Sequence, residues 1–205
     1  MTVPGPDEIE QAVGVLRNGG VIAMPSDTLY ALCAAASDAP AVQRVFDIKG
    51  RDRGRPLPLF VSDLAMAERI GGFDESSRRL ASRFWPGQLT LVATRQPGFE
   101  SEAPAGGETV GLRVPDNAVV LAVIAPTGDA VTGTSANVSG GPDTVSAEEV
   151  RRQIGECVDP ILDAGPARAG VASTMVDCTD ESPRMIRRGV VSLECIEAEP
   201  AGENG

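Results

Sequence analysis

Apolar residues recur every three or four positions in several segments of the chain, which is the spacing of one face of an α-helix. Between residues 7 and 18 this pattern starts at Asp7, which can cap the first free amides, and stops before Gly19, which can end a helix. The pattern therefore predicts an amphipathic helix over 7–18. The same argument predicts helices over residues 38–49, 62–70, 75–84, 118–125 and 146–154. The helix over 38–49 is expected to start at Asp38 or Ala39. The expected capping residues of later helices are Ser62, Asp116 and Ser146, and Pro126 is expected to end the helix over 118–125.

Short apolar runs between turn-forming residues predict β-strands. They cover residues 21–24, 57–61, 89–94, 109–114, 130–134, 161–163, 173–177 and 184–187. Because helices and strands alternate irregularly, we expect an α/β fold in which helices wrap a mixed, twisted sheet, rather than a strict parallel array. No repeat and no linker divides the sequence, which indicates a single domain over 1–205, with a core of about 7–193 and a frayed acidic tail over 197–205.

The composition limits where such a protein can work. With 205 residues, of which 42% are hydrophobic and only 3% aromatic, the chain can bury a core built mainly from aliphatic side chains. No run approaches the roughly 18 apolar residues that a membrane span needs, and the first residues have no apolar leader segment. We therefore expect a soluble, cytoplasmic protein without membrane contact.

The complete absence of histidine excludes every mechanism that needs imidazole, including Ser-His-Asp and Cys-His catalysis and histidine-ligated metals. The four cysteines form no Cys-x-x-Cys pair, which argues against zinc and favours reduced thiols. A formal net charge of -11 disfavours general binding to polyanions, so contact with a nucleic acid would need a local basic patch.

One such patch is the loop Lys49–Pro56, which follows the predicted helix over 38–49. Every second residue at the start of this loop is a cation: Lys49, Arg51, Arg53 and Arg55. The loop is therefore basic although the chain as a whole is acidic. The loop is suited to meet an anion. A solvated basic turn, with its charges paired to Asp47 and Asp52, is an equally direct interpretation of the spacing alone.

Two further polar clusters follow predicted strands, at Ser26–Thr28 and Ser135–Asn137. Together with Arg113, Ser173 and Arg187 they would place guanidinium groups and neutral donors around one concave basic cavity, a site for a phosphate-bearing ligand and a carboxylate. No glycine-rich phosphate motif is present, so side chains would hold a nucleotide, and catalysis would rely on positioning and charge neutralisation. Alternatively, Ser26 or Asp27 only caps a following helix.

Six motifs in series resemble the YrdC-like family of L-threonylcarbamoyladenylate synthases, over roughly residues 7–193. They are Pro25–Leu32, the pair Lys49–Arg51 and Ser135–Asn137, Phe84–Gly87 with Leu89–Leu91, Val110–Arg113, Ser173–Asp177, and Arg187–Gly189. One motif alone would be weak evidence. The ordered series identifies the chain as a member of this family. From its length we expect the short, single-domain form, without the C-terminal domain and gating of longer synthases.

The resemblance implies a reaction in which L-threonine and bicarbonate form a carbamate that attacks the α-phosphate of ATP. The products are threonylcarbamoyl-AMP and pyrophosphate, with Mg²⁺ accompanying the nucleotide. A downstream transferase machinery would then modify the adenosine beside the anticodon of tRNA, and direct tRNA binding would be weak at most. No protein side chain can be named as a metal ligand.

The same resemblance implies roles for individual residues. Catalysis falls to Lys49, as the electrostatic centre, with Arg51, Ser135 and Asn137. Threonine binding falls to Thr28, Tyr30, Arg113 and Ser173, and ATP binding to Arg51, Arg55, Thr109, Ser135, Asn137 and Arg187. Ser173 could instead only start a strand and Thr109 only fill one. Arg53 has no matching role, and we expect it to be solvated or paired with Asp52.

Four positions depart from the family pattern and leave substrate choice less defined than the fold. Ser26 replaces the usual threonine, Ala31 the usual glycine, Phe60 a histidine found in many members near the threonine site, and Asp143 a serine that contacts nucleotide. An acidic group at 143 would repel phosphate unless it faces ribose or a metal.

Two other functions remain open at this point. One is a non-catalytic protein that binds tRNA or structured RNA on a concave basic surface, which the net charge disfavours. The other is a carbamoyl-adenylate-forming domain like those of hydrogenase maturation proteins, which use carbamoyl phosphate. That domain normally belongs to a much longer chain with an acylphosphatase module.

Overall fold

The computed structural model of the chain describes residues 4–158, 160–180 and 182–197. The helices are α1 (Pro6–Arg17), α2 (Ala39–Lys49), α3 (Leu64–Ile70), α4 (Glu75–Phe84), α5 (Ala118–Thr127), α6 (Ala147–Ile154), a 3-10 turn (Gly155–Cys157) and α7 (Leu193–Glu197). The strands are β1 (Ile22–Pro25), β2 (Tyr30–Cys33), β3 (Leu59–Phe60), β4 (Gly71–Gly72), β5 (Leu89–Arg95), β6 (Thr109–Arg113), β7 (Val131–Thr132), β8 (Thr134–Ser135), β9 (Thr174–Asp177) and β10 (Arg184–Arg187).

These strands form two sheets. The larger has the order β10-β9-β5-β6-β3-β7, with β4 added beside β5, and the smaller has the order β1-β2-β8. The larger sheet is mixed, because β3 runs parallel to β6 and β5 parallel to β9, whereas the other pairs are antiparallel. The prediction of an α/β fold with a mixed sheet and helices is confirmed.

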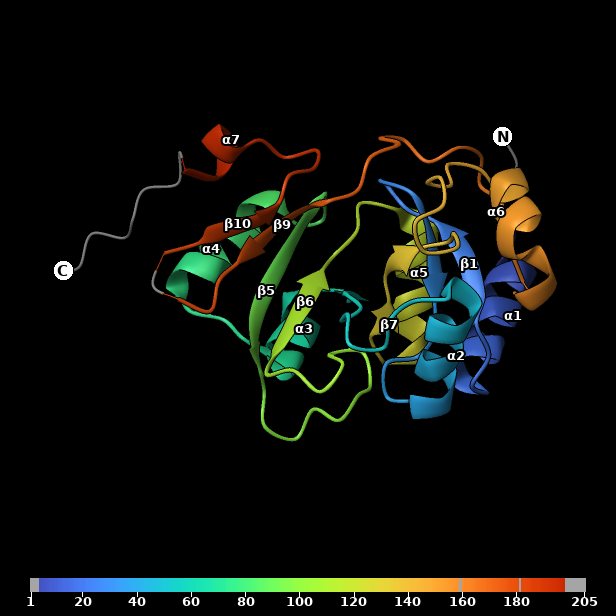
Figure 1. The fold of residues 1–205 in the computed structure, drawn as a ribbon, viewed down its shortest axis with the longest axis horizontal. Coiled ribbons are helices and arrows are strands. Elements are labelled where there is room, and N and C mark those ends of the chain that lie inside the picture. The colour runs from blue at the N-terminus through green and yellow to red at the C-terminus, as the bar shows by residue number, and fades with distance from the viewer. Residues whose placement is uncertain (1–3, 159, 181, 198–205) are drawn as a thin grey trace.

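The helices divide between the two sheets. Figure 1 shows α3 and α4 on one face of the larger sheet, while α1, α2, α5 and α6 surround the smaller one. Many fully buried side chains of the larger sheet are aliphatic, as Leu89, Leu91 and Leu112 illustrate, in accord with the low aromatic content. Across the described residues no helix is long and apolar enough to cross a membrane.

Gly133 marks the point where the chain passes from one sheet to the other. Just before it, β7 pairs with β3 in the larger sheet, and just after it, β8 pairs with β2 in the smaller sheet. The predicted strand over 130–134 is therefore divided in two. A Cβ at position 133 would lie 2.5 Å from Cδ1 of Phe60, so only glycine lets the chain pass this close to that ring.

The polar segment after the first strand is the turn of a β-hairpin, not a helix cap. The Ser26 amide donates to the Leu29 carbonyl oxygen at 3.0 Å, and β2 pairs antiparallel with β1 directly after this turn. The alternative in which Ser26 or Asp27 caps a following helix is wrong. Pro25, expected to stop the first strand, is its last residue.

Helix positions are predicted better than helix caps. Helix α4 and strand β10 have the predicted bounds, and Ser146 and Glu149 form the expected capping box of α6. Three other helices have an N-cap other than the predicted residue, although α5 begins at Ala118 as predicted. The Asp63 and Asn117 side chains accept from amides in the first turns of α3 and α5. The observed caps are Gly5, Asp63 and Asn117, in place of Asp7, Ser62 and Asp116.

Three segments differ more clearly from prediction. Residues 161–163 form no strand, and Ile161 makes only an isolated bridge to Ala23. Helix α5 continues through Pro126 to Thr127, because a proline in the last turn leaves most carbonyl partners of the helix intact. Helix α7 is not predicted at all. The predicted frayed tail lies outside the described residues, apart from Glu197 at the end of α7.

Gly189 tests how tightly the end of β10 packs against the start of β9. A Cβ at this position would overlap backbone atoms of Ala172, Ser173 and Thr174, which cannot rotate away. We expect Gly189→Ala to lower the free energy of unfolding by about 1–3 kcal/mol in urea titrations. Gly14 in α1 is the matched control, because a Cβ there meets nothing within 4 Å and Gly14→Ala should stabilise by about 0.5–1 kcal/mol. Equal stabilities of the two variants would contradict this packing.

Candidate functional site

A cavity of about 670 Å³ is lined by the β1–β2 turn, the basic loop, the sheet and the segment before β9. Its wall contains most of the predicted site residues: Thr28, Tyr30, Arg51, Arg55, Thr109, Arg113, Ser135, Ser173 and Arg187. The two predicted residues that are not in this wall are Lys49 and Asn137. The structure thus brings together residues that are up to about 160 positions apart in the sequence.

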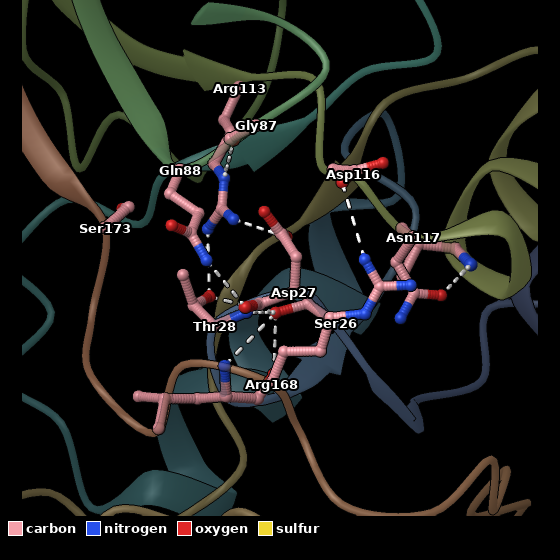
Figure 2. A network of polar contacts seen from close by, with 12 residues as sticks. Ser26, Asp27, Thr28, Gly87, Gln88, Arg113, Asp116, Asn117, Arg168 and Ser173 are labelled. Carbon is pink, nitrogen blue, oxygen red and sulfur yellow. Dashed lines mark hydrogen bonds and ion pairs between the residues drawn. The ribbon is translucent and has the colours of Figure 1, made fainter. Parts of the chain in front are cut away.

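Arg113 is fixed from several directions at one end of the cavity (Figure 2). Its guanidinium forms a 2.5 Å ion pair with Asp27, and both side chains are at most 3% exposed. It also donates to the Thr28 hydroxyl at 3.0 Å and to the Gly87 carbonyl oxygen at 2.7 Å. Burial lowers the pKa of Arg113, and the Asp27 carboxylate opposes that shift. The guanidinium is therefore held rigidly and remains charged at neutral pH.

The turn that carries Thr28 is equally ordered. The Ser26 and Thr28 hydroxyl oxygens lie 2.9 Å apart, and the Gln88 side-chain amide donates to the Asp27 carbonyl oxygen at 2.9 Å. The Gly170 amide donates to the Thr28 carbonyl oxygen at 3.0 Å. Figure 2 shows Ser26, Asp27 and Thr28 below Arg113, with Gln88 and Ser173 to one side.

Ser173 and Arg187 form a second cluster on the cavity wall. The Ser173 hydroxyl lies 2.8 Å from the Thr90 hydroxyl, and the Arg187 guanidinium donates to the Ser173 carbonyl oxygen at 2.9 Å and 3.1 Å. Burial lowers the pKa of Arg187, and Asp143 raises it. Strand β9 begins at Thr174, so Ser173 lies just before the strand, whereas Thr109 is the first residue of β6.

Lys49, the only lysine in the chain, lies behind the cavity wall and is 2% exposed. Its ammonium donates to the carbonyl oxygen of Ser135, to the carbonyl oxygen of Asn137 at 2.7 Å and to the Asn137 side-chain oxygen at 3.0 Å. Burial, followed by the charge of Arg51, lowers the pKa of Lys49 to about 8. All three ammonium protons thus hold the 135–137 loop in place.

The Asn137 side chain is fully engaged as well. Its oxygen accepts from the Ser135 hydroxyl at 2.7 Å, and its nitrogen donates to the carbonyl oxygens of Gly141 and Pro142 at 3.0 Å and 3.1 Å. Lys49 and Asn137 therefore contact each other and shape the wall that Ser135 presents to the cavity.

The cations of the basic loop are not equivalent. Arg51 donates to the carbonyl oxygens of Arg55 and Pro56 at 3.1 Å and 3.0 Å, and its pKa is lowered by burial and by the charges of Arg55 and Arg187. Arg53 instead forms an exposed 2.6 Å ion pair with Asp47 and is not in the cavity wall. The expected Arg53–Asp52 pair is wrong, because the Asp52 side chain accepts from the Gly54 amide.

Tyr30 lines the cavity with its side chain anchored elsewhere. The hydroxyl donates to the Gly165 carbonyl oxygen at 2.8 Å, and burial together with Asp163 raises the pKa of Tyr30 to about 12. Gly165 is not one of the lining residues. The Tyr30 hydroxyl therefore ties the segment before β9 to the small sheet.

Sequence reasoning missed Asp27 and Thr90 as parts of this site. Asp27 pairs with Arg113 and Thr90 contacts Ser173, and both lie inside motifs whose other residues attracted attention. The sequence signal for Asp27 is its position between Ser26 and Thr28, since an acidic residue in such a cluster can be a buried ion-pair partner of an arginine. The identity of that partner depends on the fold and not on spacing.

In the described ranges no group of three histidine, cysteine or acidic side chains is placed to hold a metal ion. Asp143 is the only carboxylate among the described residues of the cavity wall. Its negative charge raises the pKa of Lys49 and of Arg187, which places it near the basic side of the cavity.

Known proteins share both the sequence and the fold. The Sua5/yciO/yrdC family model, described as telomere recombination, matches residues 14–189. The threonylcarbamoyl-AMP synthase of Bacillus subtilis is 37% identical over 193 residues, 93% of this chain and 56% of the relative. A putative threonylcarbamoyl-AMP synthase of Mycobacterium tuberculosis is 37% identical over 189 residues, 92% of this chain and 87% of the relative.

Among solved structures, Sua5 of Pyrococcus abyssi complexed with L-threonine superposes with a TM-score of 0.90 at 36% identity. The match covers 93% of this chain and 56% of that one. The chain therefore spans just over half the length of the Bacillus and Pyrococcus proteins.

The buried Asp27–Arg113 pair generates a stability prediction. Arg113→Met leaves the Asp27 carboxylate buried without its partner, which should cost about 3–5 kcal/mol in the free energy of unfolding. The double variant Asp27→Ala/Arg113→Met should lose less than the sum of the two single changes, with a coupling of about 1–3 kcal/mol. The exposed pair Arg152–Glu148 is the control, and Arg152→Ala should change stability by less than about 0.5 kcal/mol. A loss below about 1 kcal/mol for Arg113→Met would refute this role.

Lys49 generates a prediction about pH. Its native pKa of about 8 lies below the ordinary 10.5, so between these pH values the native protein has released a proton that the unfolded chain still holds. The free energy of unfolding of the wild type, measured relative to Lys49→Met, should therefore rise from pH 8 to pH 10.5. Taking the difference cancels the other titrating groups. A difference that stays flat or falls with pH would contradict the burial of this amine.

Proposed function

The chain belongs to the Sua5/yciO/yrdC family, and from this premise we propose that it is an L-threonylcarbamoyladenylate synthase. It converts L-threonine, bicarbonate and ATP to threonylcarbamoyl-AMP and pyrophosphate. One observation carries this proposal beyond the similarity: a single cavity combines a fixed guanidinium, suited to a carboxylate, with three further guanidinium groups suited to a triphosphate. The fixed guanidinium is that of Arg113, and the three others on the same cavity are those of Arg51, Arg55 and Arg187.

The amino acid binds at the Arg113 end. The guanidinium still has N–H groups beyond those bonded to Asp27, Thr28 and Gly87, and these take the threonine carboxylate. The hydroxyls of Thr28 and Ser173 and the Tyr30 side chain complete this end. Because the surrounding bonds already fix Arg113, little conformational entropy is lost when the carboxylate binds.

ATP binds at the other end, along Arg51, Arg55, Thr109, Ser135 and Arg187. Burial lowers the pKa of Arg51, and the positive charges of Arg55 and Arg187 lower it further by repulsion. A triphosphate relieves this repulsion and takes the guanidinium donors, so binding and charge neutralisation occur together. Asn137 acts through the hydroxyl of Ser135, which it holds in place.

The chemical steps need no histidine. The threonine amine nitrogen bonds to the carbon of bicarbonate with loss of water, and an oxygen of the resulting carbamate attacks the α-phosphorus of ATP. The bond from the α-phosphorus to its bridging oxygen breaks, and pyrophosphate leaves with the electron pair. The negative charge that develops is stabilised by Arg51, Ser135 and the buried charge of Lys49. This electrostatic stabilisation is strongest in a site of low dielectric. Lys49 acts there from behind the wall.

Mg²⁺ enters with ATP, because it commonly keeps phosphate and water as most of its ligands and uses one or two carboxylates. Asp143 would supply one such carboxylate to the metal ion, beside the basic side chains of the cavity. When bound, Mg²⁺ disperses the charge of the triphosphate. Without a metal ion, the Asp143 carboxylate would repel the phosphates of the nucleotide. With Mg²⁺ between them, the same carboxylate would favour nucleotide binding.

The product is a reactive mixed anhydride, so a transferase must consume it. We assign that role to machinery that transfers the threonylcarbamoyl group to the adenosine beside the anticodon of tRNA, and we place the reaction in the cytoplasm. The net charge of -11 leaves little tendency to bind tRNA directly.

Arg51 and Arg53 provide a matched test within one loop. Arg51→Ala should lower the rate of pyrophosphate release about 100-fold or more, because it removes a donor to developing charge. Arg53→Ala should stay within about twofold of the wild type, because Arg53 pairs with Asp47 outside the cavity. Release by the wild type must require both L-threonine and bicarbonate with Mg²⁺ and ATP. Release that is independent of threonine, or supported instead by carbamoyl phosphate, would overturn the proposed function.

A further inference from the structure

In addition to Tyr30, Phe60 provides an aromatic face at the amino acid end of the cavity. This residue is the last of β3 and pairs directly with Arg113 of β6. Residues opposite each other on paired strands leave the sheet on the same face, so the ring lies beside the guanidinium. The centre of the ring is 5.6 Å from the Arg113 guanidinium carbon, which is cation–π distance.

The ring cannot retreat from the cavity. On one side it rests against Gly133, where a Cβ would lie 2.5–2.9 Å from three ring atoms. Phe60 is 3% exposed and still lines the cavity, so it presents a small, fixed apolar face to a ligand. Gly133 sits at the passage between the two sheets, and its lack of a side chain sets the depth of the ring.

The other groups at this end are hydroxyls. Those of Thr28, Thr90 and Ser173 line the same cavity. When Arg113 holds the carboxylate of an amino acid, the α- and β-carbons lie within reach of both the Phe60 ring and these hydroxyl groups. The β-carbon of threonine carries one methyl and one hydroxyl group, whereas that of serine carries only the hydroxyl.

We propose that the Phe60 ring is the surface on which the side-chain methyl group of the amino acid packs, and that Phe60 and Gly133 together set the preference for L-threonine over L-serine. This inference rests on the proposed function and names the residue pair that determines its specificity. Burial of one methyl group in a well-formed pocket typically discriminates by about tenfold or more.

Calorimetric titration of the purified chain with L-threonine and L-serine tests the inference without catalysis. The wild type should bind L-threonine about tenfold more tightly than L-serine. Phe60→Ala should reduce this ratio of affinities at least about threefold. Both affinities can also fall in this variant, because Arg113 loses a neighbour, but the ratio is the quantity that tests the inference. Phe60→Leu should keep most of the ratio. Phe73→Ala is the control, because Phe73 packs on Trp85 and lies outside the cavity wall, so the ratio should not change.

Gly133→Ala supplies an independent arm. The added methyl group at position 133 would push the Phe60 ring into the cavity, so the affinity for L-threonine should fall about tenfold. In a Phe60→Ala background the same Gly133→Ala change should lower the affinity by less than about twofold. A threonine-to-serine ratio that is equal in the wild type and folded Phe60→Ala overturns the inference and leaves the proposed function intact. Failure of the wild type to bind L-threonine at all overturns the proposed function, and the inference with it.

Discussion

The site depends on the buried ion pair between Asp27 and Arg113, because this pair joins the two sheets at the cavity. Asp27 lies on the turn of the small sheet, and Arg113 ends a central strand of the large one. Desolvation makes such a pair a weak source of stability, but its geometry is demanding, since each charge is costly without the other. The position of the β1–β2 turn and the orientation of the Arg113 guanidinium therefore depend on each other.

The distribution of charge follows the same logic. The chain has an acidic balance overall, yet Arg51, Arg55, Arg113 and Arg187 face one cavity, and part of their charge is unneutralised. Burial and mutual repulsion lower the pKa of Arg51. An anionic ligand would offset this repulsion between the guanidinium groups. The acidic remainder of the surface should direct polyanionic ligands to this one place.

Much of the fold was predictable from local pattern. Helices with a strong period and a clear cap, such as α4 and α6, follow from a few neighbouring residues. The two-residue strands and the change of sheet at Gly133 do not, because they depend on pairing with residues far along the chain. The β1–β2 hairpin was missed for a similar reason, since a polar turn after a strand also fits a helix cap.

The site shows the same division. Most of the site residues predicted from the motifs do line the cavity, and their types suit phosphate and carboxylate. Spacing could not show that the Lys49 ammonium and the Asn137 side chain are saturated by protein oxygens behind the wall. Nor could it show that Phe60 lies between Arg113 and Gly133. Those facts arise where three separate segments meet.

The central claim is that this cavity joins an amino acid, a one-carbon unit and an adenylyl group. Mass spectrometry of the product formed from ATP, L-threonine and isotopically labelled bicarbonate tests it most directly, with Lys49→Ala as the comparison. The account predicts a threonylcarbamoyl-AMP that carries the label in the wild type and is strongly reduced in the variant. An adenylate without the label, or no adenylate of threonine at all, would contradict it.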